Sequence, residues 1–162
     1  MQTGQTILDA QESNLRLVQD DRIRERHLGE LQGKRWGDMG ADISTAEPTT
    51  IFEGRLLSFW SSLFSSTSSS PLLLPLFKMD DTRYVLITSH GGSIRQLIAG
   101  LFKNGVNRQE GDYEIDLPEE RKEEGTSRRV TNCSITTIEM EQFLLDGSSR
   151  RKWKGRLLSY AE

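Results

Sequence analysis

The strongest helical pattern of apolar residues begins after Pro48. Apolar side chains recur there every three or four positions, which is the spacing of one face of an α-helix. This face is formed by Phe52, Leu56, Phe59 and Leu63 and widened by Leu57, Trp60 and Phe64. Eight of the thirteen residues from 58 to 70 are serine, and Pro71 and Pro75 follow. The pattern therefore predicts a helix that ends in a Ser/Pro-rich variable loop at about 65–80.

A strand, a glycine turn and a helix are predicted in succession from residue 84. The run 84–89 is apolar without strict alternation, which is typical of a strand covered on both faces. His90-Gly91-Gly92-Ser93 comes next. Apolar residues then recur at helical spacing to about Lys103, and Asn104-Gly105 is a typical helix end. Together these segments predict a βα unit.

The rest of the chain predicts shorter elements. They are a short helix over 1–13, a brief apolar stretch at 15–18, a charged run at 19–26, a glycine-containing loop at 27–33, a long polar loop with one helical turn at 107–129, a strand over 131–140, and a closing hairpin from 142–145 through a turn at 146–147 to 152–160. We therefore expect a single α/β domain over 1–162, with a mainly parallel sheet and helices on its faces.

Composition excludes several classes of protein. The 162 residues carry 21 Lys and Arg against 24 Asp and Glu, a net charge of −3, so a sequence-independent nucleic-acid binder is not expected. One cysteine excludes an internal disulfide framework and a cysteine-based zinc cluster. The sequence contains no run of about 18 apolar residues that could span a membrane, and no secretory leader is visible. We therefore expect a cytoplasmic protein.

His90 is the first candidate for chemistry. Ligands of open α/β sheets bind beyond the carboxyl ends of strands, near helix N-termini, and His90 follows the predicted strand directly. Gly91 and Gly92 would let the backbone approach a ligand closely, and an imidazole there could bind a phosphoryl oxygen. An ordinary surface histidine after a βα turn is equally consistent with this position.

Glu25 is the second candidate, within the charged run Arg24–Glu30. Alternating charges of this density are usually a solvated face. The functional alternative is a carboxylate that is held among arginines and gives a proton to a leaving oxygen. The basic clusters at 128–129 and 150–152 are interpreted as solvated loop charges.

Other catalytic motifs do not fit the chain. Ser93 is followed by Ile94 and Arg95, so the G-x-S-x-G elbow of serine hydrolases is absent. A Walker loop, a G-x-G-x-x-G fingerprint and an H-E-x-x-H helix are also missing from the sequence.

Three segments, in this order and spacing, resemble the phosphoglycerate mutase-like branch of the histidine phosphatase superfamily. They are RIRERHLGELQGKRW (22–36), VLITSHGGSIRQLIAGL (85–101) and VTNCSITTIE (130–139). The resemblance implies a mainly parallel three-layer sheet with helices on both faces. It also implies phosphoryl transfer through a phosphohistidine on a small phosphorylated substrate, with no metal or organic cofactor.

The resemblance assigns roles to five residues. His90 is similar to the second pocket histidine, and Glu25 is similar to the general acid/base of the family. Arg26, the neighbour of that carboxylate, Gly91 after the histidine, and Asn132 in the Asn-Cys-Ser segment are expected to bind the phosphate or the substrate.

The sequence also departs from the family. Residues 1–8 resemble the helix that follows the first strand, but no R-H-G motif with the nucleophilic histidine is present. We therefore expect an N-terminally truncated domain that lacks the first central strand. Two hypotheses follow. The first is a phosphatase or mutase whose activity is impaired. The second is a non-catalytic module that retains half of the pocket and binds a phosphate ligand or a partner. The sequence does not specify the substrate or the oligomeric state.

Overall fold

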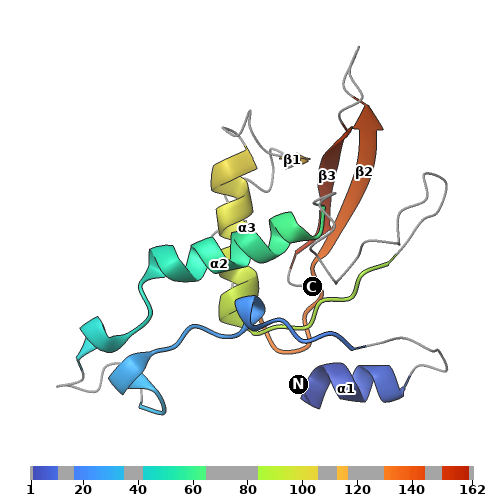
Figure 1. Ribbon diagram of the computed structural model, residues 1–162. Coiled ribbons are helices and arrows are strands. Elements are labelled where there is room, and N and C mark those ends of the chain that lie inside the picture. Colours follow the sequence, from blue (N-terminus) through green and yellow to red (C-terminus); the bar gives the residue numbers. More distant parts are fainter. Residues whose placement is uncertain are drawn as a thin grey trace.

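The computed structural model describes residues 2–10, 17–34, 42–64, 84–105, 113–116, 130–144 and 151–160 (Figure 1). Their helices are α1 (Gln2–Asp9), α2 (Thr49–Ser62) and α3 (Gly91–Gly105), and their strands are β1 (Tyr113–Asp116), β2 (Thr137–Leu144) and β3 (Arg151–Ser159). Short 3₁₀ turns lie at Asp21–Ile23, Gly29–Leu31 and Ile43–Thr45. The predicted variable loop at about 65–80 and the turn at 146–147 lie outside the described residues.

The prediction of a mainly parallel three-layer sheet is wrong. The described strands form one mixed sheet in the order β1-β3-β2, in which β1 runs parallel to β3 and β2 runs antiparallel to it. The antiparallel β2–β3 ladder is the longer of the two and pairs the two predicted arms of the closing hairpin, although β2 also includes residues 137–140, which were predicted as part of a separate strand. Helices α2 and α3 lie on the same side of this sheet rather than on opposite faces (Figure 1).

The segment 84–89, predicted as a covered strand, is extended but belongs to no ladder. Tyr84 is 94% exposed and Leu86 is 72% exposed. A strand needs a neighbour to accept and donate its backbone hydrogen bonds, and a run that is apolar on both faces also needs cover on both. In the part of the chain that the structure describes, no strand pairs with this segment, so its apolar pattern is not matched by burial.

Helices α2 and α3 form where the periodicity predicts them. The predicted face of α2 is buried, with Leu56 1% and Phe59 4% exposed, and Leu101 of α3 is 1% exposed. The core joins α2 and α3 to the sheet. On the sheet side, β1, β3 and Tyr160 contribute buried side chains, and β2 contributes partly buried side chains that pack against the core. Its members from the sheet side are Tyr113, Ile115, Trp153, Leu157 and Tyr160, with Ile138 and Met140 packed against them.

Two elements near the C-terminus differ from prediction. The strand expected at 131–140 begins at Thr137, because residues 131–134 form a turn in which Cys133 has a φ of 63°. Strand β1 lies in the segment predicted as a long polar loop. Tyr113 and Ile115 are buried there, and a strand of four residues has too few positions to show a period.

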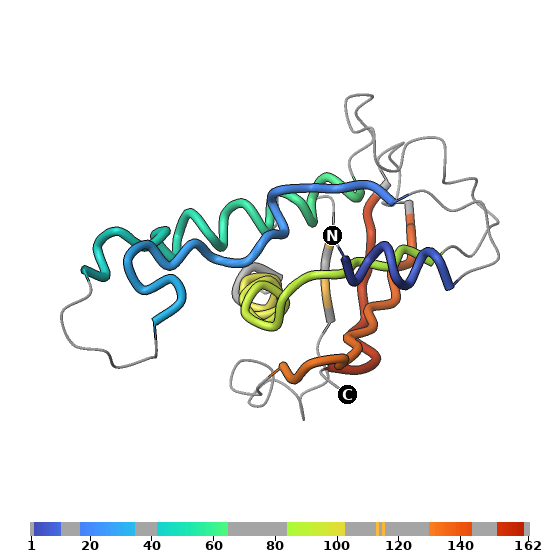
Figure 2. The backbone as a smooth tube through the Cα atoms, turned by 90° about the horizontal axis from the view of Figure 1, so that it is seen from below, coloured from blue at the N-terminus to red at the C-terminus, as the bar shows by residue number. Residues whose placement is uncertain are grey.

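Figure 2 follows the chain from below and shows how the two extended stretches before the helices run. Residues 17–20 and 84–90 both carry the chain toward the N-terminal end of α3 (Figure 2). Helix α1 packs beside them, since a Cβ on Gly4 would lie 3.1 Å from both Leu17 Cδ1 and Thr88 Oγ1. These irregular segments, rather than sheet strands, position the candidate site.

Candidate functional site

His90 directly precedes α3. Its carbonyl accepts a hydrogen bond from Ile94 N at 2.9 Å, which is the first hydrogen bond of the helix. The imidazole is 64% exposed. The first N–H groups of an α-helix have no partner within the helix and carry a partial positive charge, so they favour an anion. The structure therefore places an accessible imidazole at an anion-favouring position.

Glu25 lies close to this histidine. Its Oε2 is 3.9 Å from His90 Nδ1, and the carboxylate side chain is 43% exposed. Its Oε1 accepts a hydrogen bond from Arg26 N at 3.1 Å. A Cβ on Gly92 would lie only 2.6 Å from Glu25 Oε1, so glycine at this position leaves room for the carboxylate. The two catalytic candidates are thus neighbours at the start of α3.

Two serines attach the Glu25 segment to the start of α3. Ser89 Oγ donates to Ile23 O at 2.6 Å, and Ser93 Oγ donates to Arg24 O at 3.1 Å. Ser93 is 1% exposed, so its hydroxyl needs a partner. These serines flank His90, and side-chain hydrogen bonds therefore replace a sheet ladder between the two segments. Sequence reasoning did not assign this role to either residue.

Helix α2 holds the same segment from the other side through Arg55. Its guanidinium donates to both oxygens of Glu47, from Nε to Oε1 at 2.7 Å and from Nη2 to Oε2 at 2.9 Å. Nη1 donates to Arg22 O at 2.6 Å and to Arg24 O at 2.9 Å, and Nη2 donates to Glu25 O at 3.2 Å. The two side chains are only 14% and 10% exposed. This network was missed by the sequence analysis.

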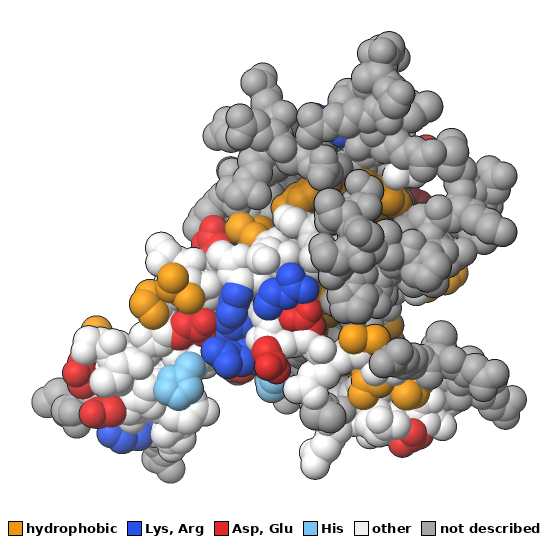
Figure 3. Space-filling view, in the orientation of Figure 1, with side chains coloured by type: hydrophobic (Ala, Val, Ile, Leu, Met, Phe, Trp, Pro, Cys, Tyr) orange, Lys and Arg blue, Asp and Glu red, His pale blue; other side chains and the backbone are white. Residues whose placement is uncertain are grey.

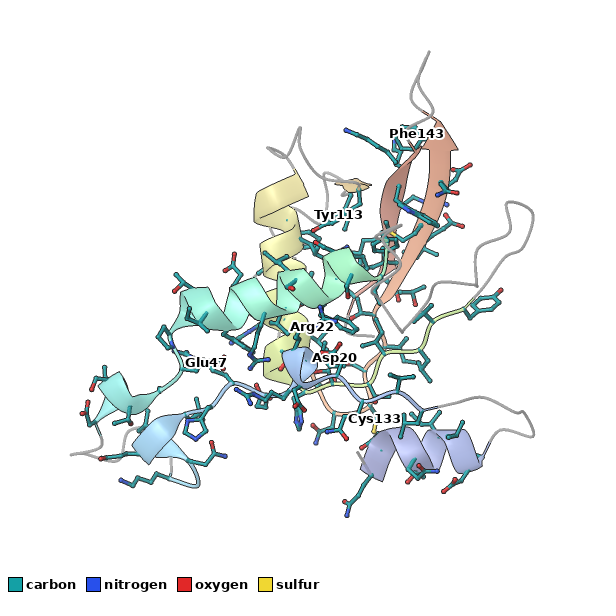
Figure 4. The ribbon with its side chains drawn as sticks, in the orientation of Figure 1. Asp20, Arg22, Glu47, Tyr113, Cys133 and Phe143 are labelled. Atoms are coloured by element: carbon teal, nitrogen blue, oxygen red, sulfur yellow. The ribbon has the colours of Figure 1, made fainter. Side chains whose placement is uncertain are left out.

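The ion pairs of this region change the acidity of two carboxylates. The hydrogen bonds from Arg55 hold the pKa of Glu47 below its usual value, and they outweigh the opposite effect of burial. In the same way, the side-chain hydrogen bonds of Arg22 lower the pKa of Asp20. Asp20 and Arg22 lie together below α2 in the view of Figure 4, and Glu47 lies at the start of that helix.

The remaining predicted site residues are Arg26, Gly91 and Asn132. Arg26 Nε donates to Glu47 O at 2.7 Å, so one of its donors is used within the loop. A Cβ on Gly91 would lie 3.0 Å from Val130 O, so this glycine allows the 130–134 segment to approach α3. Asn132 lies in the exposed turn two residues further on. No hydrogen bond joins it to His90 or Glu25 within the described residues.

His27, the only other histidine of the chain, does not face His90 in this network. Its Nδ1 accepts a hydrogen bond from Gly29 N at 3.1 Å, and its carbonyl accepts one from Glu47 N at 2.8 Å. These contacts bind the residue to its own loop, where Gly29 has a φ of 57°.

Figure 3 shows that basic and acidic side chains intermingle in the middle of one face, with histidine beside them. Comparison of the chain with protein-family models, with curated proteins and with solved structures gives no match. Over the described ranges, no helix is long and apolar enough to cross a membrane. Nor do the described residues contain a group of three or more metal-binding side chains.

Proposed function

We propose that this chain binds the phosphoryl group of a small phosphomonoester at the N-terminus of α3. The single observation that carries the proposal is the His90 imidazole at the start of this helix, with a Glu25 carboxylate oxygen 3.9 Å from its Nδ1. In this arrangement His90 is the phosphate ligand and Glu25 is the proton donor to the ester oxygen. The ligand class is a small phosphorylated molecule, bound without a cofactor.

The charges of the site support an oxyanion ligand. Helix α3 is 15 residues long, so its N-terminus carries the full partial charge of an α-helix. A protonated carboxyl at this place can pass its proton to the ester oxygen.

The resemblance to histidine phosphatases supports the same ligand from the sequence. The motifs around Glu25 and His90 are the ones that carry it, and these two residues are neighbours in the structure. The fold that the resemblance implied is wrong for the described residues. The proposal therefore depends on the local geometry and the residue types, and the family's mechanism is not needed for it.

Turnover is the second candidate function, and one observation favours it. Nδ1 of His90 faces Glu25, which leaves Nε2 to act as the nucleophile. In this step the Nε2 lone pair forms a bond to phosphorus, the P–O ester bond breaks, and the leaving oxygen takes a proton from Glu25. Water then cleaves the P–N bond, releases inorganic phosphate and returns the proton. The reaction would be that of a phosphatase, or of a mutase if a second substrate oxygen replaced water.

Calorimetry tests the binding proposal directly. The full chain is titrated with inorganic phosphate and with p-nitrophenyl phosphate, alongside the variants His90→Asn and Glu25→Gln. We expect wild-type binding that weakens about tenfold or more in His90→Asn, because a hydrogen bond to a charged group is lost. His27→Asn is the matched control, since an asparagine oxygen can accept the bond from Gly29 N. A wild-type chain that binds neither probe, or binds both equally well without His90, contradicts the proposal.

The same proteins separate binding from turnover. Release of p-nitrophenol by the wild type, but not by His90→Asn, would support phosphoryl transfer. A phosphoprotein that is labile in acid and stable in base would identify the phosphohistidine. Binding with no product release and no phosphoprotein would leave the chain as a phosphate-binding module without turnover.

A further inference from the structure

The geometry points to Arg55, anchored by Glu47, as a positioning residue that sets the Glu25 carboxylate against His90. This inference rests on the proposed function for its meaning, because it names the residue that prepares the phosphate site. Arg55 itself does not contact the site side chains. It acts through the backbone of the loop that carries Glu25.

Every donor of the Arg55 guanidinium is used. An arginine has five N–H groups, and the five contacts of Arg55 go to two carboxylate oxygens of Glu47 and to three backbone carbonyls. The guanidinium also lies 4.7 Å from the centre of the Phe52 ring. A planar group fixed by five hydrogen bonds and a ring face has a single orientation, so it can hold the loop in one conformation.

The carbonyls that Arg55 binds are those next to the site. One belongs to Glu25 itself, and another belongs to Arg24. Arg24 O also accepts the hydroxyl of the buried Ser93, two residues after Gly91. A single peptide group is therefore held by α2 through Arg55 and by α3 through Ser93. The position of this peptide group fixes the Cα atom of Glu25, and with it the direction in which the Glu25 side chain extends toward the N-terminus of α3.

Lysine at position 55 would keep the charge but not this geometry. An ammonium group has three donors and no planar fork, so it cannot bind both Glu47 oxygens and three carbonyls at once. We therefore expect Arg55→Lys to loosen the Glu25 segment, and to weaken phosphate binding about tenfold in the full chain.

Arg22 provides a matched structural control. It also attaches the loop to α2, through Ser58 O at 3.2 Å and Ser62 Oγ at 3.0 Å, and it pairs with Asp20. Its side chain, however, binds no backbone group of residues 24 and 25. Arg22→Lys therefore removes a comparable loop anchor without changing the anchor of Glu25.

The first measurement needs no ligand. The chain has two histidines, so carbon–proton correlation spectra of its imidazole rings show two Cε1–H signals, one from each ring, which His90→Asn and His27→Asn assign. At one neutral pH, Glu25→Gln moves the His90 signal because a charge leaves its neighbourhood. We expect Arg55→Lys to move this signal in the same direction, to add nothing in the double variant with Glu25→Gln, and to be unmatched by Arg22→Lys.

The second measurement is a double-mutant cycle on the affinity for p-nitrophenyl phosphate. If Arg55 acts through Glu25, the weakening caused by Arg55→Lys disappears in the Glu25→Gln background. A purely structural effect would be the same in both backgrounds. If Arg55→Lys does not fold, Glu47→Gln replaces it, because loss of the two-oxygen anchor should loosen the guanidinium and move the His90 signal in the same direction by a smaller amount; a His90 signal that stays at its wild-type position in Glu47→Gln overturns the role of Arg55.

The outcomes distinguish the two proposals. A chain that binds no phosphate probe contradicts the proposed function, while the imidazole spectra still test Arg55. A His90 signal that is unchanged by Arg55→Lys, or moved equally by Arg22→Lys, overturns the positioning role. So does a loss of affinity that persists without the Glu25 carboxylate.

Discussion

The ion pair between Glu47 and Arg55 should make a large contribution to stability, which Glu47→Gln would remove. Each Glu47 oxygen accepts a guanidinium N–H, at 2.7 and 2.9 Å, and the pair is 10% and 14% exposed. Oε2 also accepts His27 N at 3.3 Å. Glutamine has the same shape but no charge and only one acceptor oxygen.

The magnitude follows from what glutamine cannot replace. At least one hydrogen bond to a charged group is lost, which costs about 1.5–3 kcal/mol. The remaining Arg55 charge has little access to water, and removal of one partner of a fully buried pair costs about 3–5 kcal/mol. Since the pair keeps some exposure and the three carbonyl contacts remain, we expect the free energy of unfolding to fall by about 2–3 kcal/mol.

Urea and thermal unfolding at neutral pH measure this difference. For a chain of this size, the expected loss corresponds to a melting temperature lower by roughly 4–12 °C. Glu139→Gln is the matched control, because Glu139 Oε2 lies 2.8 Å from Arg156 Nη2 in a pair that is 56% and 66% exposed. An exposed pair of this kind should change stability by less than about 0.5–1 kcal/mol.

The pH dependence gives an independent check. The pKa of Glu47 is lower in the folded chain than its ordinary value of 4.5, so the unfolded state binds the proton more tightly. The stabilisation by the charged form is therefore complete above that value and is lost as pH falls through the folded pKa. The difference between wild type and Glu47→Gln should shrink on acidification below about pH 4.5. Equal stabilities of Glu47→Gln and Glu139→Gln, or a difference that does not change in acid, would refute the reasoning.

Three other substitutions have expected outcomes. Asp20→Asn should lower the free energy of unfolding by about 1 kcal/mol at neutral pH, and the difference should vanish in acid because the folded pKa of Asp20 is below its ordinary value of 3.8. Gly155→Ala should cost about 1–3 kcal/mol in urea unfolding, since the new Cβ would lie 2.5 Å from Met140 Sδ in the core. Gly92→Ala should change stability by less than about 1 kcal/mol but displace the flexible Glu25 carboxylate, so the His90 imidazole signal should move as it does in Glu25→Gln.

Helices α2 and α3 could be predicted because a helix satisfies its backbone hydrogen bonds within one segment. The strands could not be predicted equally well. β1 exists through its parallel pairing with β3, in which Tyr113 lies opposite Trp153, and nothing local in a four-residue segment indicates that partner. The segment 84–89 has the opposite problem: its residues suit a covered strand, but the described chain brings no strand beside it.

The candidate site shows the same division. His90 and Glu25 could be selected from their motifs, and the structure brings them within 3.9 Å. Arg55 and Glu47 could not, because an arginine on an amphipathic helix is most often a solvated charge. Three of the five acceptors of Arg55 are backbone carbonyls, which are present at every residue and leave no pattern in the sequence. The burial of Arg55 can therefore be recognised only in the folded structure, where the loop that carries Glu25 lies against α2.

The error in the predicted sheet has a limited effect on the site, because the site is not built on the sheet. Arg55 comes from α2 and Ser93 from α3, and both bind the carbonyl of Arg24. The described sheet contacts the same two helices through the aromatic core, where Trp60 and Tyr113 lie 6.5 Å apart, edge to face. The relative position of α2 and α3 is thus the common requirement of core and site. Damage to the core should reach the site only by separating these helices, whereas damage to the Arg55 network should disturb His90 while the core remains packed.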